Sequence, residues 1–324
     1  MKFCAACHQD LPKDKFSKKQ WKLGAQIQRR CTSCVADNRE VQPPPIIDNN
    51  ESANNNTGIV NLLDSMCIEE MQTISDEDLF KQPPQKDDCP ICFLRMPALS
   101  SGSKYEVCCG KVICSGCIYA NAKIDLDKQL CPFCRTPPPD TDDELVKRNK
   151  KRMEDGDAEA IYCHGVYYDD GMFGLPQNRV KALELYHQAG ELGEARAYTN
   201  IGYAYINGEG VSRDEKKAKY YWELAAILGS TYSRFNLGIL EESNGNMDRA
   251  LKHFMIAAAG GYSDSLSEVK NLFKHGHATK DDYTKALRAH QLYVDDVKSD
   301  QRDKAAAYSD EFKTISVHRC NICT

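Results

Sequence analysis

Small and apolar side chains recur at regular intervals in the second half of the chain. Three consecutive segments, 157–193, 194–229 and 230–261, carry glycine, alanine and aromatic residues at equivalent positions. Within each segment the apolar residues follow the spacing of a helix face. Spacings of 36–37 residues, shortened to 32 in the third segment, are typical of a two-helix repeat. The pattern therefore predicts a stack of helix pairs.

The equivalent positions are Gly165, Gly202 and Gly238; Ala182, Ala218 and Ala250; Tyr186, Trp222 and Phe254; and Gly193, Gly229 and Gly261. These landmarks resemble the Sel-one-like subclass of tetratricopeptide-type repeats, which implies a scaffold that binds partner proteins along a concave face. A fourth segment, 262–299, keeps the helical pattern but few landmarks, and we expect it to cap the stack. The tyrosines of these segments either line a groove or, as we favour, belong to the core.

Proline-rich and polar stretches divide the rest of the chain. Residues 41–88 form a predicted linker with a possible short amphipathic helix over 62–80, which either packs on the next domain or binds a partner. A second break, at 136–140, precedes Thr141, a good helix cap that opens the helical region 141–299. Residues 300–324 are expected to form a tail, in which His318, Cys320 and Cys323 have no fourth metal ligand nearby.

Cysteine usage changes this picture. The 324 residues include 16 cysteines, of which twelve form CxxC or CC pairs before residue 135. The chain shows neither an apolar run long enough for a membrane span nor an apolar signal segment, which predicts an intracellular protein, cytoplasmic or nuclear. In a reducing compartment, paired cysteines favour metal thiolates over disulfides.

The densest cysteine pattern spans residues 89–135. Two residues between cysteines is the spacing of a turn that directs both thiolates at one tetrahedral ion. Three such pairs and the adjacent Cys108–Cys109 pair imply two ions, and thiolate-only sites in a small module favour zinc. The eight candidate ligands are Cys89, Cys92, Cys108, Cys109, Cys114, Cys117, Cys131 and Cys134.

The pattern resembles a RING finger, in the variant whose eight ligands are all cysteine. The resemblance implies interleaved pairing, with Cys89, Cys92, Cys114 and Cys117 on one ion and Cys108, Cys109, Cys131 and Cys134 on the other. It also implies a ubiquitin ligase that binds a ubiquitin-conjugating enzyme through Ile91, Pro132 and Arg135. Two positions depart from the family: Lys111 replaces a common histidine ligand, and Asn121 replaces a frequent tryptophan.

A third cysteine set lies at the N-terminus. Residues 1–40 hold Cys4, Cys7, Cys31 and Cys34, a complete ligand set for a further zinc ion, which makes about three in all. The stretch between them resembles the small zinc domain of the Stc-one family, which implies a role in bridging proteins. This segment contains nine Lys and Arg residues but only four Asp and Glu residues. The four thiolates of a zinc-bound site would reduce this basic bias. We therefore disfavour nucleic-acid binding.

Together these observations predict a multidomain protein: two small zinc-bound α+β modules followed by an all-α solenoid of helix-pair repeats. The leading functional hypothesis is a RING-type E3 ubiquitin ligase, which acts by positioning a charged conjugating enzyme without a covalent intermediate, while the repeats bind the substrate. The alternative is a non-enzymatic, zinc-dependent adaptor that binds other proteins. No membrane is expected as a partner.

Overall fold

The structure, a computed structural model, describes residues 2–4, 9–11, 74–84, 87–98, 102–124 and 129–312. The chain divides into two units, Met1–Ala53 and Asn54–Thr324. In the first unit, strands β1 (Lys2–Cys4) and β2 (Gln9–Leu11) pair in antiparallel orientation. Of the predicted N-terminal zinc ligands, Cys7, Cys31 and Cys34 lie outside the described residues, and Cys4 is described only as the end of β1.

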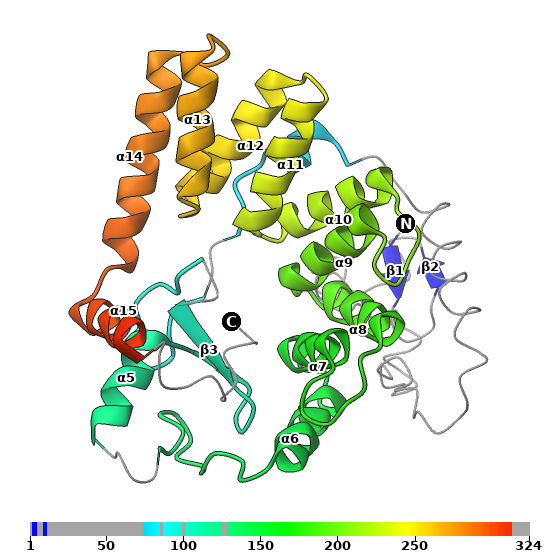
Figure 1. Ribbon diagram of the computed structural model, residues 1–324, viewed down its shortest axis with the longest axis vertical. Helices are drawn as coiled ribbons and strands as arrows, with labels where there is room; N and C mark the ends of the chain where they lie inside the picture. Colours follow the sequence, from blue (N-terminus) through cyan, green and yellow to red (C-terminus); the bar gives the residue numbers. More distant parts are fainter. Residues whose placement is uncertain are drawn as a thin grey trace. The chain divides into compact units, whose positions relative to one another are not determined.

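The second unit begins, within the described residues, with a short helix and a hairpin. Helix α4 spans Asp76–Leu79. Strands β3 (Ser103–Glu106) and β4 (Lys111–Cys114) form an antiparallel hairpin, and helix α5 (Ser115–Ile124) follows β4 directly (Figure 1). Hairpin and helix together carry the central cysteines of the 89–135 region.

Helix pairs fill most of the remaining chain. Their bounds are α6 Asp142–Glu154, α7 Ala158–Asp170, α8 Arg179–Glu191, α9 Ala195–Asn207, α10 Glu215–Ile227, α11 Thr231–Ser243, α12 Met247–Ala259, α13 Asp264–Lys274 and α14 Lys280–Val297. The antiparallel pairs α7–α8, α9–α10 and α11–α12 are the three predicted repeats, and each packs on the next (Figure 1). The predicted helical solenoid is confirmed.

Local sequence explains where these helices begin and end. Thr141 caps α6 as predicted, since its hydroxyl accepts from the Glu144 amide at 3.2 Å. Asp214 caps α10 in the same way through the amide of Lys217 at 3.0 Å. Helices α7 and α9 end at Gly171 (φ 66°) and Gly208 (φ 76°) in the left-handed conformation, which glycine adopts at little cost.

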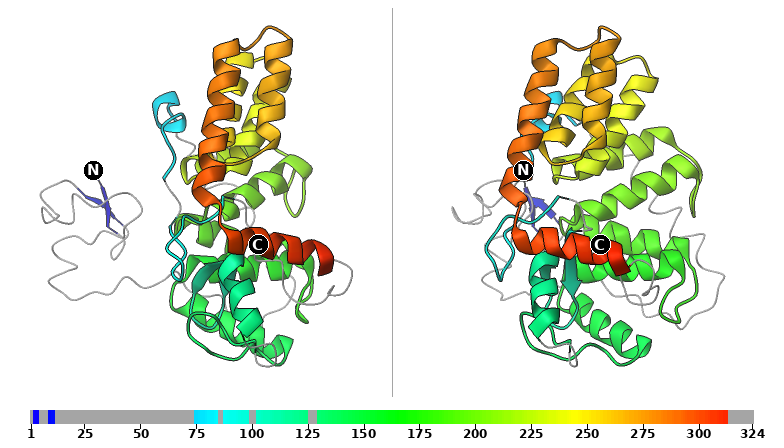
Figure 2. Two further views of the ribbon diagram at one scale, coloured as in Figure 1. Left: turned by 90° about the vertical axis from the view of Figure 1, so that its left-hand side faces the viewer. Right: turned by 60° about the vertical axis from the view of Figure 1, so that its left-hand side comes forward.

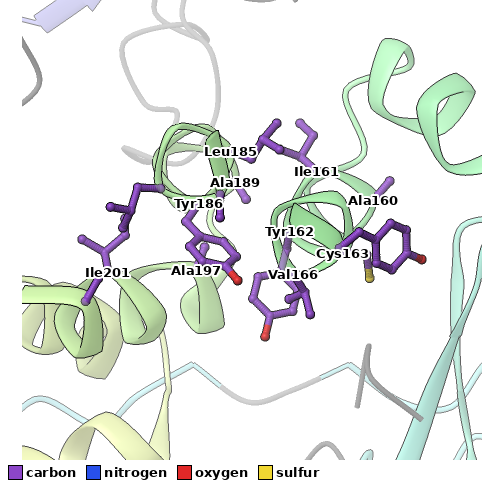
Figure 3. Close-up of a cluster of buried hydrophobic side chains, with 14 of the residues drawn as sticks. Ala160, Ile161, Tyr162, Cys163, Val166, Leu185, Tyr186, Ala189, Ala197 and Ile201 are labelled. Atoms are coloured by element: carbon purple, nitrogen blue, oxygen red, sulfur yellow. The ribbon is translucent and has the colours of Figure 1, made fainter. Parts of the chain in front are cut away.

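The repeat landmarks form the core between the helices of each pair. A Cβ atom added at Gly202 would overlap the Trp222 ring, so the glycine allows α9 and α10 to approach closely. Gly165 with Tyr186 and Gly238 with Phe254 repeat this arrangement. Tyr186 lies among Ala189, Ile201 and the α7 side chains of the first repeat (Figure 3). The aromatic landmarks are thus core residues. Of the tyrosines expected in the core, Tyr162, Tyr167 and Tyr221 are buried, whereas Tyr198 and Tyr203 are partly buried.

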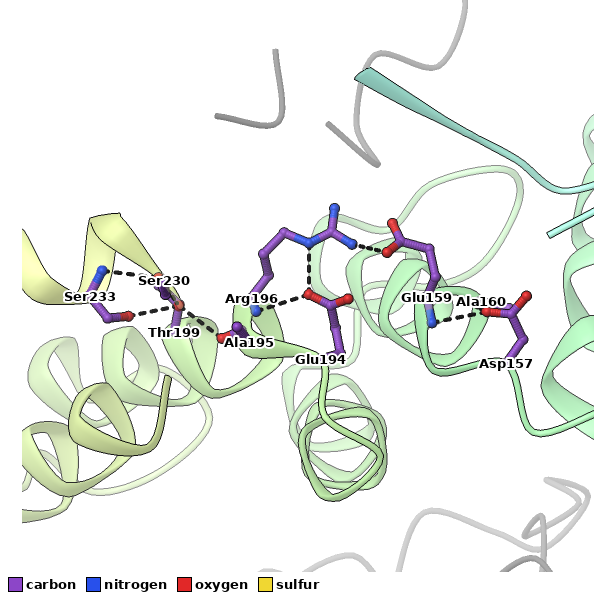
Figure 4. Close-up of polar contacts among 9 residues, drawn as sticks. All are labelled: Asp157, Glu159, Ala160, Glu194, Ala195, Arg196, Thr199, Ser230 and Ser233. Atoms are coloured by element: carbon purple, nitrogen blue, oxygen red, sulfur yellow. Dashed lines mark hydrogen bonds and ion pairs between the residues drawn. The ribbon is translucent and has the colours of Figure 1, made fainter. Parts of the chain in front are cut away.

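Polar contacts also join successive repeats. Arg196, at the start of α9, pairs with its neighbour Glu194 and with Glu159 of α7 (Figure 4). Thr199 of α9 bonds the Ser233 hydroxyl of α11 at 2.8 Å. These groups connect α7, α9 and α11, the first helices of the three repeats, and so fix the repeats relative to one another.

The fourth segment is helical as its pattern predicts, whereas the segment expected to be a tail differs from the prediction. Helices α13 and α14 form a further pair, as expected of a cap. The chain then continues as helix α15 (Asp300–Phe312) instead of a tail. Helix α15 lies against α5 of the cysteine-rich region (Figure 2). The tail prediction is therefore wrong for residues 300–312, because contacts distant in sequence order this polar segment; His318, Cys320 and Cys323 lie outside the described residues.

Candidate metal centres

The eight candidate ligands of the 89–135 region gather in two groups. Their sulfur atoms lie within 4.8 Å of one another inside each group. One group is Cys89, Cys92, Cys114 and Cys117, and the other is Cys108, Cys109, Cys131 and Cys134. These are the same two sets that the interleaved pairing implies.

The sulfur spacing matches tetrahedral zinc. Zn–S bonds of about 2.3 Å in a tetrahedron place the sulfur atoms about 3.8 Å apart. The measured Sγ–Sγ distances are 3.9 Å for Cys89–Cys117 and 3.7 Å for Cys92–Cys114. In the second group they are 3.9 Å for Cys109–Cys131 and 3.4 Å for Cys108–Cys134. All eight cysteines are free thiols, so the donor set suits a thiophilic ion.

The two outer CxxC pairs have the same backbone conformation. The Cys89 amide donates to the Leu94 carbonyl, and the Phe93 amide donates to the Cys89 carbonyl, both at 2.9 Å. The turn from Cys131 to Thr136 repeats this arrangement. The Cys131 amide donates to the Thr136 carbonyl at 2.9 Å, and the Arg135 amide donates to the Cys131 carbonyl at 3.0 Å. Both turns close with a left-handed residue, at φ 57° and 62°. Backbone hydrogen bonds alone thus direct each cysteine pair to one point.

Cys108 and Cys109 lie in the turn of the β3–β4 hairpin. The amides of Cys109 and Gly110 both donate to the Glu106 carbonyl, at 3.1 and 2.9 Å. Gly110 has φ 65°, a left-handed conformation that supplies the kink two adjacent ligands need. Both sulfur atoms therefore reach the second group, while Lys111 begins β4 and is exposed.

Electrostatics favour a bound cation in each group. Burial raises the pKa of Cys108 and Cys117, and neighbouring cysteines raise it further, because thiolates at this distance repel one another. Burial also acts on Cys89, but the amides of Cys92, Cys114 and Ile91 outweigh it and lower the pKa to about 7. Four thiolates coexist at this spacing only when a cation offsets their charge, so the residues fit a zinc ion in both groups.

Two arginines that the sequence analysis missed support the metal groups from outside. Arg302 of α15 is buried and donates to the carbonyls of Arg95 (2.8 Å) and Leu94 (3.3 Å), next to the first group. Arg152 of α6 donates to the Cys108 carbonyl at 2.8 Å, next to the second. Each arginine is distant in sequence from the cysteines that it supports, so no local motif identifies it.

The three residues proposed to contact a conjugating enzyme have different surroundings. Ile91 is partly buried against the first cysteine group. Arg135 is exposed and donates to the Asn121 side chain at 2.7 Å, so the residue that replaces the family tryptophan binds the arginine instead. Pro132 lines a pocket of about 810 Å³ together with Leu145 and Tyr167 of the helices.

Comparison with known families identifies the helical part. The Sel1 repeat family matches residues 158–194 and 195–230, which correspond to α7–α8 and α9–α10. Residues 158–230 are thus Sel1 repeats, a kind of helical repeat that acts in protein–protein interaction. Across the described ranges, no helix combines the length and apolar character that crossing a membrane requires.

Two curated relatives resemble part of the chain. Chitin synthase regulatory factor 4 of Schizosaccharomyces pombe is 29% identical over 115 residues, and the ERAD-associated E3 ubiquitin-protein ligase component HRD3B of Arabidopsis thaliana is 28% identical over 113 residues. Each match covers 35% of this chain and 18% of the relative. The chain therefore spans about a fifth of the length of either relative.

Solved structures resemble the chain at low identity. A Sel1 repeat protein from Oxalobacter formigenes is 23% identical, with a TM-score of 0.44 over 55% of this chain and 73% of that one. Immunity protein Pa5087 from Pseudomonas aeruginosa is 22% identical, with a TM-score of 0.33 over 56% and 65%.

Proposed function

We propose that this protein is a zinc-binding, RING-type E3 ubiquitin ligase, in which the cysteine-rich region recruits a conjugating enzyme and the Sel1 repeats bind the substrate. The observation that carries the proposal is the pair of four-sulfur groups built from interleaved cysteine pairs. Ile91 lies in the turn that contains Cys89 and Cys92, and Arg135 lies in the turn that contains Cys131 and Cys134, so each proposed contact residue is next to one cysteine group. The relative named as an ERAD-associated E3 ubiquitin-protein ligase component adds support, since it is 28% identical to this chain over 113 residues.

The proposed chemistry is catalysis by positioning. Two zinc ions hold the 89–135 region folded and take no part in bond making. Ile91 offers the conjugating enzyme an apolar contact, and the Arg135 guanidinium bridges the enzyme and its ubiquitin. Holding the thioester in a reactive geometry accelerates attack by a substrate lysine without any nucleophile from this chain.

A discharge assay tests the proposal. A conjugating enzyme charged with ubiquitin is mixed with free lysine and the full chain, and loss of the thioester is followed on non-reducing gels. The wild-type chain is expected to accelerate discharge, and Ile91→Ala and Arg135→Ala are each expected to reduce the rate at least about tenfold, because positioning contributions are large.

Matched controls separate a lost contact from a damaged module. Ile124→Ala removes an 84% exposed isoleucine from the end of α5, and Lys111→Ala removes an exposed charge from β4. Both controls are expected to keep the wild-type rate and zinc content. If a panel of conjugating enzymes shows no discharge above background with the wild-type chain, the ligase proposal is wrong.

A non-enzymatic adaptor is the second candidate. It is favoured by the position of Pro132, which lines the pocket beside α6 and α7, and by polar Asn121 at the usual tryptophan position. An adaptor would load zinc and capture partner proteins through residues 141–299 while leaving the ubiquitin thioester intact.

A further inference from the structure

A short segment upstream of the metal groups lies against the side of the repeats. This 74–80 segment, Ile-Ser-Asp-Glu-Asp-Leu-Phe, contains α4 (Figure 1, cyan). Its Leu79 is fully buried among Trp222, Leu237 and Leu240, which belong to α10 and α11. The described part of the predicted 62–80 helix thus packs on the repeats and not on the next domain along the chain; residues 62–73 lie outside the described residues.

The next residue extends the contact to α12. The Phe80 ring lies 4.8 Å from the His253 ring, centroid to centroid. Arg249 and Lys252 place their charged groups 5.3 and 5.2 Å from the Phe80 centroid, in the range of cation–π attraction. Leu79 and Phe80 therefore occupy two adjacent subsites on the repeats, one apolar and one basic.

An ion pair fixes the direction of the segment. The Asp76 carboxylate pairs with the Arg249 guanidinium, three residues before Leu79. Arg249 is oriented for this contact by Glu241, which is buried and accepts from the Arg249 Nε at 3.2 Å and from Lys219 at 2.7 Å. The repeats thus present a pre-arranged cation at one end of the site and an apolar pocket at the other.

The anchorage of this segment is slight. Helix α4 has only four residues, and the Asp76, Glu77 and Asp78 side chains are exposed. One buried leucine, the partly buried Ile74 and Phe80 with its two cation–π contacts, and one partly exposed ion pair hold a segment that is followed by predicted linker. Such a contact is maintained mainly by the high effective concentration of a tethered peptide, and a competing peptide can displace it.

We propose that the α10–α12 surface is a peptide-binding site for partner proteins that carry an acidic residue three positions before a Leu-Phe pair, and that the 74–80 segment is an internal competitor for this site. The charge and shape of the site match this pattern: Arg249 for the acidic residue, the Trp222–Leu237 pocket for leucine, and the His253–Arg249–Lys252 face for phenylalanine. Rigid helices supply the groove, as in other cases where a short amphipathic helix docks. The inference deepens the proposed function, because it names the partner class of the repeats.

Fluorescence anisotropy with the full chain tests the proposal. The probe is a labelled synthetic peptide of residues 74–82. In Leu79→Ala/Phe80→Ala the internal segment is weakened and the groove residues are unchanged, so this variant is expected to bind the probe at least about tenfold more tightly than the wild-type chain does. No binding by the double variant, or equal affinity of both chains, would overturn the proposal.

Charge exchange identifies the subsite. Arg249→Glu, added to the double variant, is expected to lower the affinity for the probe at least about tenfold. A probe with lysine in place of Asp76 is expected to bind this triple variant again. Lys147→Glu, an exposed charge reversal on α6, is the matched control and is expected to bind the original probe like the double variant. If the exchanged probe fails to recover, the assigned contact is wrong.

Hydrogen exchange in the wild-type chain gives a measurement that needs no substitution. Excess unlabelled peptide is expected to displace the internal segment and speed exchange of the Leu79 and Phe80 amides, which donate to Ser75 and Asp76 carbonyls at 2.9 and 3.0 Å. Unchanged exchange at saturating peptide would contradict displacement. Concentration-dependent dimerisation of the wild-type chain through this segment would instead make a second copy the occupant and overturn the partner proposal. None of these assays contains ubiquitin or a conjugating enzyme, so they can succeed where the ligase proposal fails.

Discussion

The cysteine-rich region and the repeats are stabilised in opposite ways. The buried cluster of the cysteine-rich region contains six residues, Cys89, Met96, Ile113, Cys114, Cys117 and Cys131, and four of them are candidate metal ligands. The first repeats instead bury a large cluster of alanines, tyrosines and branched aliphatic residues around Tyr186 and Ile201. We therefore expect the cysteine-rich region to depend on bound ions for its core, whereas the repeats bury a large apolar cluster that needs no ion.

This difference has a consequence for function. The cysteine-rich region presents short turns closed by backbone hydrogen bonds, Cys89–Phe93 and Cys131–Arg135, which suit precise placement of a partner. A region of stacked helices presents a long surface with separate subsites, of which the 74–80 segment occupies one. Arg152 and Arg302 connect the two regions through carbonyls beside the metal groups. The following predictions test whether the two regions are as different as this comparison states.

The largest effect is expected from loss of one metal ligand. Cys114→Ser should release the ion of the first group and unfold the cysteine-rich region, because structural zinc contributes about 10–16 kcal/mol of apparent folding free energy. Zinc content and near-UV circular dichroism measure the result. Cys163→Ser, a fully buried cysteine in the repeat core, is the matched control and should retain all zinc. Retention of both ions by Cys114→Ser would contradict the assignment.

Truncation of a core aromatic residue should act on the repeats alone. Phe254→Ala removes a fully buried ring from the third repeat and is expected to cost about 3–5 kcal/mol of unfolding free energy, with zinc content unchanged. Urea unfolding followed at 222 nm measures this cost. Phe273→Ala, at a ring that is 38% exposed, should cost clearly less, and equal costs would argue against the burial pattern.

Overpacking of a repeat contact should have a smaller effect. Gly202→Ala places a methyl group against the Trp222 ring and is expected to cost about 1–3 kcal/mol, because α9 and α10 must move apart. Thermal unfolding measures the loss. Trp222→Leu in the same chain should relieve part of the cost of Gly202→Ala. If the costs of the two substitutions instead add, the Gly202–Trp222 contact does not set the distance between α9 and α10.

A drop of one pH unit below about 6.5 should give the smallest change, and in the repeats. Burial and the neighbouring cations Arg234, Arg249 and Lys219 lower the pKa of His253 to about 3, although Glu241 opposes them and Phe80 covers the ring. The unfolded chain binds this proton near pH 6.5, so stability is present above that pH and falls as the pH drops toward 3. The contribution of His253 to the unfolding free energy changes by at most about 1.4 kcal/mol per pH unit. His253→Phe should flatten the pH profile of unfolding, and an unchanged profile would exclude His253 as its source.

The features that sequence predicted are those set by local spacing. The repeat boundaries follow from a period that places Gly202 opposite Trp222, and the metal groups follow from cysteine pairs whose turns are closed by backbone bonds. The helix start at Thr141 needs only one side chain and one amide. In each of these cases the relevant contacts lie within one repeat or within one turn, so the linear pattern contains them.

The features that sequence did not predict depend on distant contacts. Helix α15 is polar, and its order comes from Arg302, whose partners Leu94 and Arg95 lie more than 200 residues earlier. The 74–80 segment has a weak helical pattern, and its anchoring by Trp222 and Arg249 is visible only once the repeats are folded. The surroundings of Pro132 could not be predicted either, because residues of α6 and α7 line the same pocket.

Native mass spectrometry of the full chain, before and after exhaustive chelation, tests the central claim most directly. The account predicts two zinc ions bound by the 89–135 region, a third if Cys4, Cys7, Cys31 and Cys34 form the proposed N-terminal site, and a broadened charge distribution once the metal is removed. Fewer than two zinc ions, or an unchanged charge distribution after chelation, would contradict it.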